Sequence, residues 1–222
     1  MAAKIHRYHE AKTRKPIKFV YFDVGGVMFN FSDMFTSLAD VLNVPKKDVY
    51  DFWEPRDDAL NLGTLTPGEF WRQIKTHFRY RGQDIDLVDL WLTSFRPIKE
   101  THAFVRKVSR TRKIGLLTNA MPGSVAKTRA LGHIPRVRFT AIIESSVLGI
   151  TKPNPKIYSI AQKRAGVAAG EILFIDDNKI NLRQAHTSGF HTYHFDTDNP
   201  AASVEELEKL TNLSPHVPCV TK

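Results

Sequence analysis

Apolar residues in this chain gather in short runs and, elsewhere, recur at the spacing of one helix face. The mostly apolar runs cover residues 19–22, 113–118, 139–144, 172–177 and 192–195. Runs of this length are typical of strands buried in a parallel sheet. Helical patterns follow three of them, after Pro122, from about Pro155, and from about Lys179 to Thr187. This repeated strand–helix order predicts an α/β fold built on a parallel sheet with right-handed crossovers.

A long segment between the first and second runs, roughly residues 31–100, has a helical pattern throughout. Apolar residues recur there at helical spacing, as at Met34, Leu38, Val41 and Leu42, and again at Phe70, Trp71, Ile74 and Phe78. Thr66 followed by Pro67 and Glu69 predicts a helix start with a capping box. About seventy residues are too many for a loop in a compact domain, so we expect an inserted α-helical subdomain.

These patterns predict the division of the chain. We expect an α/β core from residues 18–30 plus 101–213 and a helical cap from residues 31–100. A basic N-terminal arm over residues 1–17 and a flexible tail over residues 214–222 complete the prediction.

The composition excludes several classes of protein. Hydrophobic residues make up 42% of the 222 residues and charged residues 25%, which is ordinary for a globular protein. No stretch approaches the roughly 20 apolar residues that span a bilayer, and no apolar segment follows the basic N-terminus as in a secretory signal. The single cysteine, Cys219, can form no internal disulfide. We therefore expect a cytoplasmic protein without a membrane partner.

The formal net charge is +9. Clustered Lys and Arg residues can bind nucleic acid, but neither basic cluster, residues 4–18 or 106–113, contains a nucleic-acid-binding motif. A basic surface that attracts anionic small molecules is the simpler interpretation, so we do not expect a nucleic-acid partner.

Polar and charged residues that could take part in catalysis or binding lie at the ends of the predicted strands. Asp23 follows the first strand, and two glycines come shortly after it. The second and fourth strands, and the segment after the third, contribute Thr118, Asn119, Lys152, Asp176 and Asp177. Because ligands bind at the carboxyl edge of an open parallel sheet, we expect these residues to form one site.

Each of these residue types has a role in chemistry at phosphate. Asp23 can act as a nucleophile if the charge of the substrate is offset. The acidic pair Asp176 and Asp177 can hold Mg²⁺, which prefers oxygen ligands. Lys152 suits a phosphoryl oxygen, and Thr118 and Asn119 can donate hydrogen bonds to the other oxygens. Together these groups would stabilise the charge in a phosphoryl-transfer transition state.

With these residues in this order, the chain resembles the haloacid dehalogenase superfamily, with a helical cap inserted after the first motif. The resemblance runs from about Ile17 to Phe195. It rests on four motifs: Phe22-Asp23-Val24-Gly25-Gly26-Val27, Leu117-Thr118-Asn119, Lys152-Pro153, and Phe174-Ile175-Asp176-Asp177 with Asn181. It implies a Rossmann-like core and an aspartyl-phosphate on Asp23.

The resemblance also implies a set of metal ligands and site residues. Mg²⁺ would be bound by Asp23, by the main-chain carbonyl of Gly25 and by the acidic pair. We favour Asp177 as the direct ligand and Asp176 as a hydrogen-bonding or water-mediated partner. Lys152 would neutralise charge, and with Thr118 and Asn119 it would bind the phosphate.

Gly25 is a departure from the pattern of the family's phosphatases, which usually carry a second aspartate there as general acid and base. A main-chain carbonyl can still bind metal, but a proton-transfer role typically worth ~10²–10⁴-fold is lost. His77 and His102 are candidate replacements, although nothing in the sequence places either near the site.

Three functions remain open on this basis. The first is a phosphatase for a small phosphorylated metabolite with a good leaving group, such as a sugar-1-phosphate, and this is the function we favour. The second is a dehalogenase, which works without metal and would leave Asp176 and Asp177 without a role. The third is a catalytically impaired binding or regulatory protein that keeps the fold.

Overall fold

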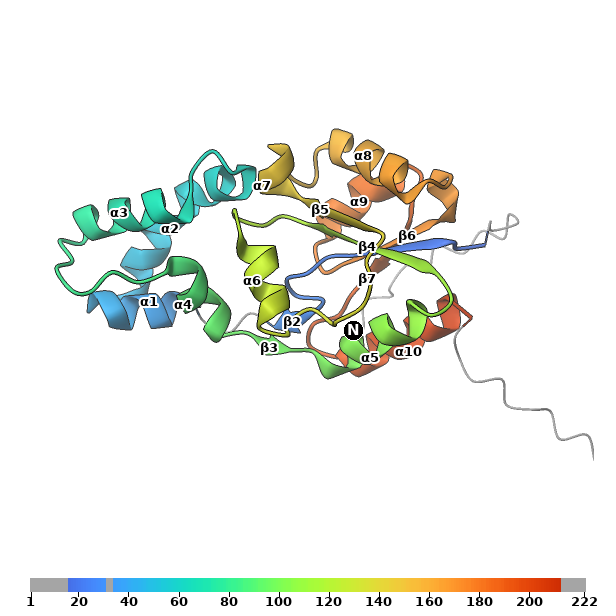
Figure 1. The fold of residues 1–222 in the computed structure, drawn as a ribbon, viewed down its shortest axis with the longest axis horizontal. Coiled ribbons are helices and arrows are strands. Elements are labelled where there is room, and N and C mark those ends of the chain that lie inside the picture. Colours follow the sequence, from blue (N-terminus) through green and yellow to red (C-terminus); the bar gives the residue numbers. More distant parts are fainter. Residues whose placement is uncertain (1–15, 31–33, 213–222) are drawn as a thin grey trace, which may run out of the picture.

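The computed structural model describes residues 16–30 and 34–212 and has a parallel β-sheet at its centre (Figure 1). The five strands lie in the order β5-β4-β1-β6-β7, with β1 in the middle. They are β1 (Phe19–Phe22), β4 (Lys113–Thr118), β5 (Ala141–Glu144), β6 (Ile172–Asp176) and β7 (His191–His194). Every pairing in this sheet is parallel, so the predicted α/β class is confirmed.

Successive residues of β1 enter different hydrophobic cores because side chains alternate between the two faces of a strand. Phe19 and Tyr21 belong to one core, and Val20 and Phe22 belong to the other. All four side chains are fully buried, which explains why the sequence shows a continuous apolar run here.

Helices cover both faces of the sheet. On one face lie α8 (Pro155–Ala165) and α9 (Lys179–Thr187), and on the other lie α5 (Lys99–Val108) and α10 (Pro200–Leu210). The shorter elements α6 (Ser124–Ala130), α7 (Ser145–Leu148) and the 3₁₀ turn η1 (Ala169–Glu171) complete this part of the fold. The described residues contain no helix long and apolar enough to cross a membrane.

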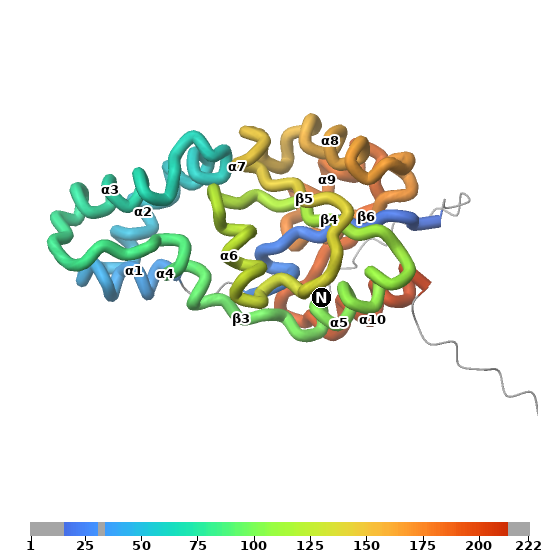
Figure 2. The backbone as a smooth tube through the Cα atoms, viewed as in Figure 1, coloured from blue at the N-terminus to red at the C-terminus, as the bar shows by residue number. Residues whose placement is uncertain are grey.

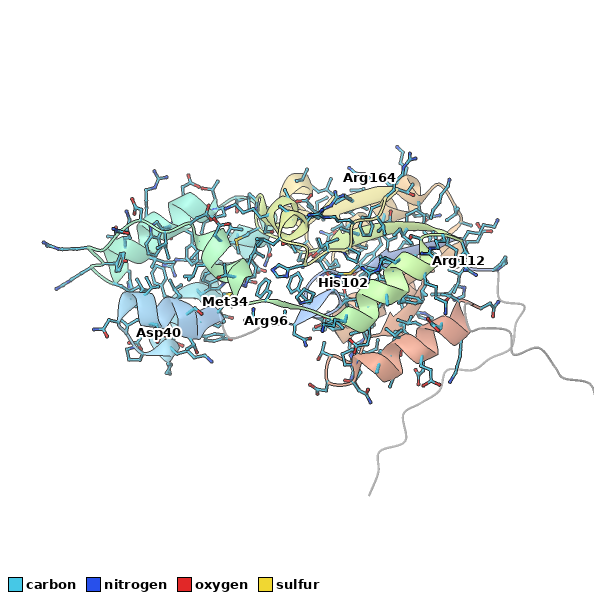
Figure 3. All side chains as sticks on the ribbon, turned by 60° about the horizontal axis from the view of Figure 1, so that its bottom comes forward. Met34, Asp40, Arg96, His102, Arg112 and Arg164 are labelled. Atoms are coloured by element: carbon cyan, nitrogen blue, oxygen red, sulfur yellow. The ribbon has the colours of Figure 1, made fainter. Side chains whose placement is uncertain are left out.

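Between β1 and α5, the described residues form an insertion of four helices. It comprises α1 (Met34–Leu42), α2 (Lys46–Leu62), α3 (Pro67–His77) and α4 (Leu87–Thr93). Two short antiparallel strands, β2 (Phe29–Asn30) and β3 (Arg96–Pro97), carry the chain into and out of it. The helices lie beyond the carboxyl ends of the sheet strands (Figure 2). In Figure 3, Met34 and Asp40 mark the insertion, Arg112 and Arg164 mark the part with the sheet, and Arg96 lies where the two parts join.

The insertion packs against the sheet part on two sides. Helix α2 contacts α7, and α4 contacts α6. Lys127 of α6 forms ion pairs with Asp86 at 2.5 Å and with Asp89 at 2.8 Å. These contacts hold the insertion over the carboxyl edge of the sheet.

Most predicted elements match the structure within two residues. Thr66 and Glu69 form the predicted capping box at the start of α3, and α9 has the predicted bounds. The strand predicted over 139–144 starts only at Ala141, where pairing with β4 begins opposite Gly115. The strand predicted over 192–195 is shifted by one residue to His191–His194.

Some predictions fall on segments outside the described residues. Most of the predicted N-terminal arm, the tail over 214–222 and Cys219 lie outside the described residues. The division into a core (18–30 plus 101–213) and a cap (31–100) stays a prediction.

Candidate functional site

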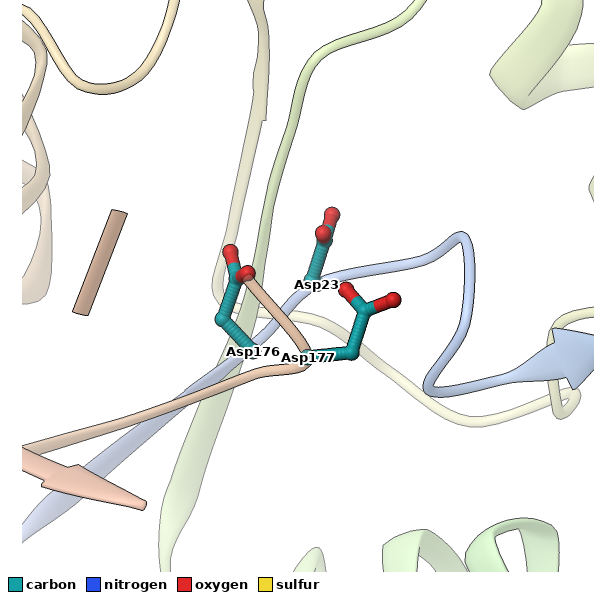
Figure 4. A group of neighbouring side chains, drawn as sticks. All are labelled: Asp23, Asp176 and Asp177. Carbon is teal, nitrogen blue, oxygen red and sulfur yellow. The ribbon is translucent and has the colours of Figure 1, made fainter. Parts of the chain in front are cut away.

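Parallel strand register brings the predicted acidic residues to one edge of the sheet. Phe22 pairs with Ile175 at the end of β1 and β6, and the N–H of Asp23 donates to the carbonyl of Ile175 at 2.8 Å. Asp23 therefore lies directly beside Asp176 and Asp177. Each of these three aspartates offers a carboxylate oxygen, and these oxygens all lie within 4.8 Å of one another (Figure 4).

Lys152 joins two of the three carboxylates. Its Nζ lies 2.9 Å from Asp23 Oδ2 and 2.7 Å from Asp176 Oδ2. The lysine side chain is only 1% exposed, so this charge pairing takes place away from bulk water. Burial alone would lower the pKa of Lys152, but Asp23 and Asp176 raise it above its ordinary value and keep the ammonium charged.

Asp176 is the most constrained of the three carboxylates. It is fully buried, and besides Lys152 it accepts hydrogen bonds from the N–H of Asn178 at 2.7 Å and from the Asn181 side-chain amide at 3.2 Å. These bonds occupy both oxygens of the Asp176 carboxylate, and Asp177 is the less buried of the pair.

Two of the carboxylates at this site have raised pKa values. Burial raises the pKa of Asp23 to about 7; Lys152 opposes this rise, and the charge of Asp176 adds to it. Burial and the neighbouring Asp176 also raise the pKa of Asp177. One lysine thus faces three carboxylates, and a divalent cation among their oxygens would relieve the remaining repulsion.

The Asn119 side chain contacts both the main-chain N–H and the main-chain carbonyl of Lys152. The N–H of Lys152 donates to Asn119 Oδ1 at 2.8 Å, and Asn119 Nδ2 donates to the carbonyl of Lys152 at 3.0 Å. The side chain therefore positions the lysine, a role that the sequence did not indicate. Its assignment to phosphate binding stays a prediction.

Thr118 ends β4 beside this pair. Its side chain is buried, and its hydroxyl donates to the carbonyl of Asn119 at 3.3 Å. Thr118, Asn119, Lys152, Asp23, Gly25 and Asp177 all line one cavity of about 390 Å³. The structure thus gathers nearly all the predicted site residues around a single cavity, while Asp176 is fully buried and is not among the lining residues.

The insertion supplies the other wall of the cavity, and its residues were not predicted from the sequence. Helix α2 contributes Asp57 and Asn61, and the end of α4 with the residues after it contributes Trp91, Leu92 and Phe95. A helical pattern showed that these segments were helices, but no signal in the sequence indicated which turn would face the site.

The two histidines considered as replacements for the missing acid lie elsewhere. His102 Nε2 donates to the carbonyls of Met28 and His133, at 3.2 and 3.0 Å. The ring of His77 packs against Phe52 at 4.4 Å between centroids. Neither histidine lines the cavity, so the structure does not support either as the surrogate acid or base.

This chain is an α/β protein with an acidic site beneath a helical insertion. Its lysine is buried between carboxylates at the carboxyl edge of a parallel sheet. The sequence model of the haloacid dehalogenase-like hydrolases matches residues 17–185, and the chain belongs to this family.

Similar proteins are found among curated sequences and among solved structures. The chain is 30% identical over 128 residues to acyl-CoA dehydrogenase family member 10 of Mus musculus, a match that covers 57% of this chain and 12% of that protein. It therefore spans only a small part of this relative's length.

Among the solved structures, the haloacid dehalogenase family enzyme bt-2542 from Bacteroides thetaiotaomicron superposes with a TM-score of 0.71 and 21% identity, over 86% of this chain and 99% of that one. This bacterial enzyme is also known as a complex with magnesium and inorganic phosphate. A 2-haloacid dehalogenase from Pseudomonas syringae matches with a TM-score of 0.63 and 17% identity, over 89% and 99% of the two chains. These likenesses show the shared fold.

Proposed function

We propose that this chain is a Mg²⁺-dependent phosphatase that hydrolyses a small phosphorylated metabolite through an aspartyl-phosphate on Asp23. The observation that carries the proposal is the 2.9 Å pairing of Asp23 with the buried Lys152 ammonium, at a cavity that two further aspartates adjoin. A carboxylate can approach a phosphate dianion only where positive charge offsets the repulsion. The complex of the bacterial enzyme of similar fold with magnesium and inorganic phosphate supports this direction.

The metal would be held by carboxylates of Asp23 and Asp177 and by the main-chain carbonyl of Gly25, with Asp176 as an indirect partner. The donor set fits, because Mg²⁺ prefers oxygen ligands and the three carboxylates have oxygens within 4.8 Å. When bound, the ion adds positive charge beside the transferring phosphoryl group.

In the first step, a carboxylate oxygen of Asp23 forms a bond to phosphorus while the bond from phosphorus to the leaving oxygen breaks. The leaving oxygen keeps the bonding electrons, and Lys152 offsets charge beside the nucleophile. The Thr118 hydroxyl and the N–H groups of the following turn would donate to the phosphoryl oxygens. Water then attacks phosphorus, the bond to Asp23 breaks, and phosphate and the free carboxylate are regenerated.

Gly25 limits which phosphate esters the protein can hydrolyse. A glycine has no side chain to protonate the leaving oxygen, and the described residues bring no histidine into the cavity to replace it. We therefore propose leaving groups that are stable without protonation by the enzyme, such as the anomeric oxygen of a sugar-1-phosphate.

The same glycine favours a second candidate, a catalytically impaired protein that binds a phosphorylated ligand. A metal-independent dehalogenase accounts less well for the site, because the paired Asp176 and Asp177 would have no role in it.

The test is a panel of phosphorylated metabolites, with and without Mg²⁺, using the native protein and Asp23→Asn. Mg²⁺-dependent release of phosphate that Asp23→Asn abolishes supports the phosphatase. The absence of turnover, together with a beryllofluoride adduct at Asp23, would favour the impaired binding protein. No turnover and no adduct would contradict phosphoryl chemistry at Asp23 altogether.

A further inference from the structure

Polar groups of the helical insertion face the same cavity as Asp23. Asp57 and Asn61 of α2 line it together with Trp91 of α4. Because Asp23 and Lys152 lie at the sheet edge, a phosphate at that edge would leave the rest of its ester near this second wall. The chemistry of the wall therefore bears on the leaving group.

Asp57 is held in place by two neighbours one helical turn away on either side. Trp53 Nε1 donates to Asp57 Oδ1 at 3.1 Å, and Asn61 Nδ2 donates to Asp57 Oδ2 at 2.8 Å. Residues four apart lie on one face of a helix, so the three side chains form a row along α2. A carboxylate has about four acceptor positions, and these two bonds leave capacity for a donor from a ligand.

Trp91 also lines this wall, and it carries a donor that neighbouring atoms cover. Among the described side chains that line the cavity, its indole N–H is the one buried polar group without a hydrogen-bond partner. A buried donor left unsatisfied costs free energy, so an acceptor supplied by a ligand would be favoured here.

An apolar surface lies next to these polar groups. The Trp91 ring packs edge-on to Phe95 at 5.6 Å between centroids, and Phe95 stacks on Phe29 at 4.5 Å. Both phenylalanines line the cavity. The wall therefore combines an acceptor, a donor and aromatic surface.

Hydrogen bonds also fix this wall relative to the edge of the sheet where Asp23 and Lys152 lie. The hydroxyl of Ser145, at the start of α7, donates to the carbonyl of Asn61 at 2.5 Å. The same oxygen accepts from the N–H of Ala120 at 2.9 Å, directly after Thr118 and Asn119. This buried serine thus connects the end of α2 to the turn that carries the predicted phosphate-binding residues.

We propose that Asp57, Asn61 and Trp91 recognise the hydroxyl groups of a polyhydroxylated leaving group, so that the substrate is a sugar phosphate. A hydroxyl can donate to Asp57 and accept from the indole N–H of Trp91, whereas an ammonium group can only donate and an alkyl chain can do neither. The C–H face of a sugar ring suits the aromatic surface. This inference rests on the proposed phosphatase function.

The experiment compares kcat/KM for a hexose 1-phosphate and for phenyl phosphate, which has no hydroxyl groups, in the presence of Mg²⁺. Loss of a hydrogen bond to a charged group predicts that Asp57→Asn lowers the ratio of hexose ester to phenyl ester by about tenfold to a hundredfold. Trp91→Phe keeps an aromatic ring, removes the N–H and is expected to lower the ratio by about fivefold to tenfold. Asp58→Asn is the matched control, because Asp58 is an exposed neighbour outside the cavity lining.

Each outcome bears on a different claim. An unchanged ratio in both Asp57→Asn and Trp91→Phe would overturn the inference while the phosphatase stands. Hydrolysis of phenyl phosphate with none of the hexose ester by the native protein would also overturn it. If the native protein hydrolyses neither ester, the proposed function itself is contradicted and the inference falls with it.

Discussion

The carboxylate of Asp177 lies against the main chain of Gly26, so closely that a Cβ atom on Gly26 would be 2.2 Å from Asp177 Oδ2. Gly26 also has a φ of +71°, which favours glycine. The second glycine of the first motif thus makes room for an acidic residue of the fourth, and the two segments can close around one site only because no side chain lies between them.

Gly26→Ala is therefore expected to displace Asp177 and to weaken Mg²⁺ binding and Mg²⁺-dependent turnover by at least about tenfold. Gly132→Ala is the matched control, because Gly132 has a φ of +81° and open space around the Cβ position. Both variants carry a backbone cost of about 1–2 kcal/mol, visible in thermal unfolding. Equal Mg²⁺ affinity in the two variants would show that the contact with Asp177 does not matter.

Asn119 is expected to act through Lys152. Asn119→Ala removes two hydrogen bonds to the Lys152 main chain, each worth about 1 kcal/mol, and leaves the ammonium less well placed beside Asp23. We expect kcat to fall about tenfold with a smaller change in KM, as measured by steady-state kinetics.

Asn154→Ala provides the comparison. Asn154 caps α8 two residues after Lys152, so its loss is expected to cost about 1 kcal/mol of stability. Its side chain lies outside the cavity lining, and kcat should stay close to the native value. If both variants lose kcat equally, the effect belongs to the loop as a whole rather than to the Asn119 contacts.

The raised pKa of Asp23, about 7, predicts that protons compete with the metal. Mg²⁺ affinity should fall by about tenfold for each pH unit below this value, because the metal binds the ionised carboxylate. Isothermal titration calorimetry at pH 5.5, 6.5 and 8 measures the dependence, and buffers of different ionisation enthalpy reveal the released proton. A flat affinity across this range would contradict the raised pKa.

The raised pKa of Asp23 also makes the stability of the metal-free protein depend on pH. The folded protein holds the Asp23 proton at pH values where the unfolded chain has lost it. The contribution of Asp23 to the free energy of unfolding therefore decreases as pH rises from about 4 to 7. Saturating Mg²⁺ should restore stability at the upper end of this window, which thermal unfolding can show.

Gly25 is expected to set the dependence on the leaving group. In Gly25→Asp, a carboxyl group could protonate a poor leaving oxygen, so hydrolysis of an alkyl phosphate should rise relative to that of an aryl phosphate. The native protein should cleave the aryl ester far faster than the alkyl ester. Similar native rates on both esters would show that the missing acid does not limit the reaction.

Much of the fold, and the meeting of the predicted residues at one edge of the sheet, could be predicted from the sequence because both depend on the positions of the strands. Asp23, Thr118 and Asp176 stand at strand ends, and parallel register brings such ends together whatever the loops do. The roles within the site were less accessible. That Asn119 clamps the Lys152 main chain depends on the path of the loop between β5 and α8, which no local pattern specifies.

The wall formed by the insertion was not predicted for a similar reason. Asp57 and Trp91 lie in helical segments, but which of their faces meets the cavity is set by tertiary contacts such as the Ser145 bridge to Asn61. A single polar residue on an amphipathic helix gives no sign of its partner across the fold.

The most direct test of the central claim, that Asp23 is a phosphoryl-accepting nucleophile, is Mg²⁺-dependent hydrolysis of phenyl phosphate by the native protein and by Asp23→Asn. Asp58→Asn serves as the control for a change of charge on the exposed surface. The account predicts measurable hydrolysis by the native and Asp58→Asn proteins, and none above buffer by Asp23→Asn with its fold intact. Full activity in Asp23→Asn would contradict it.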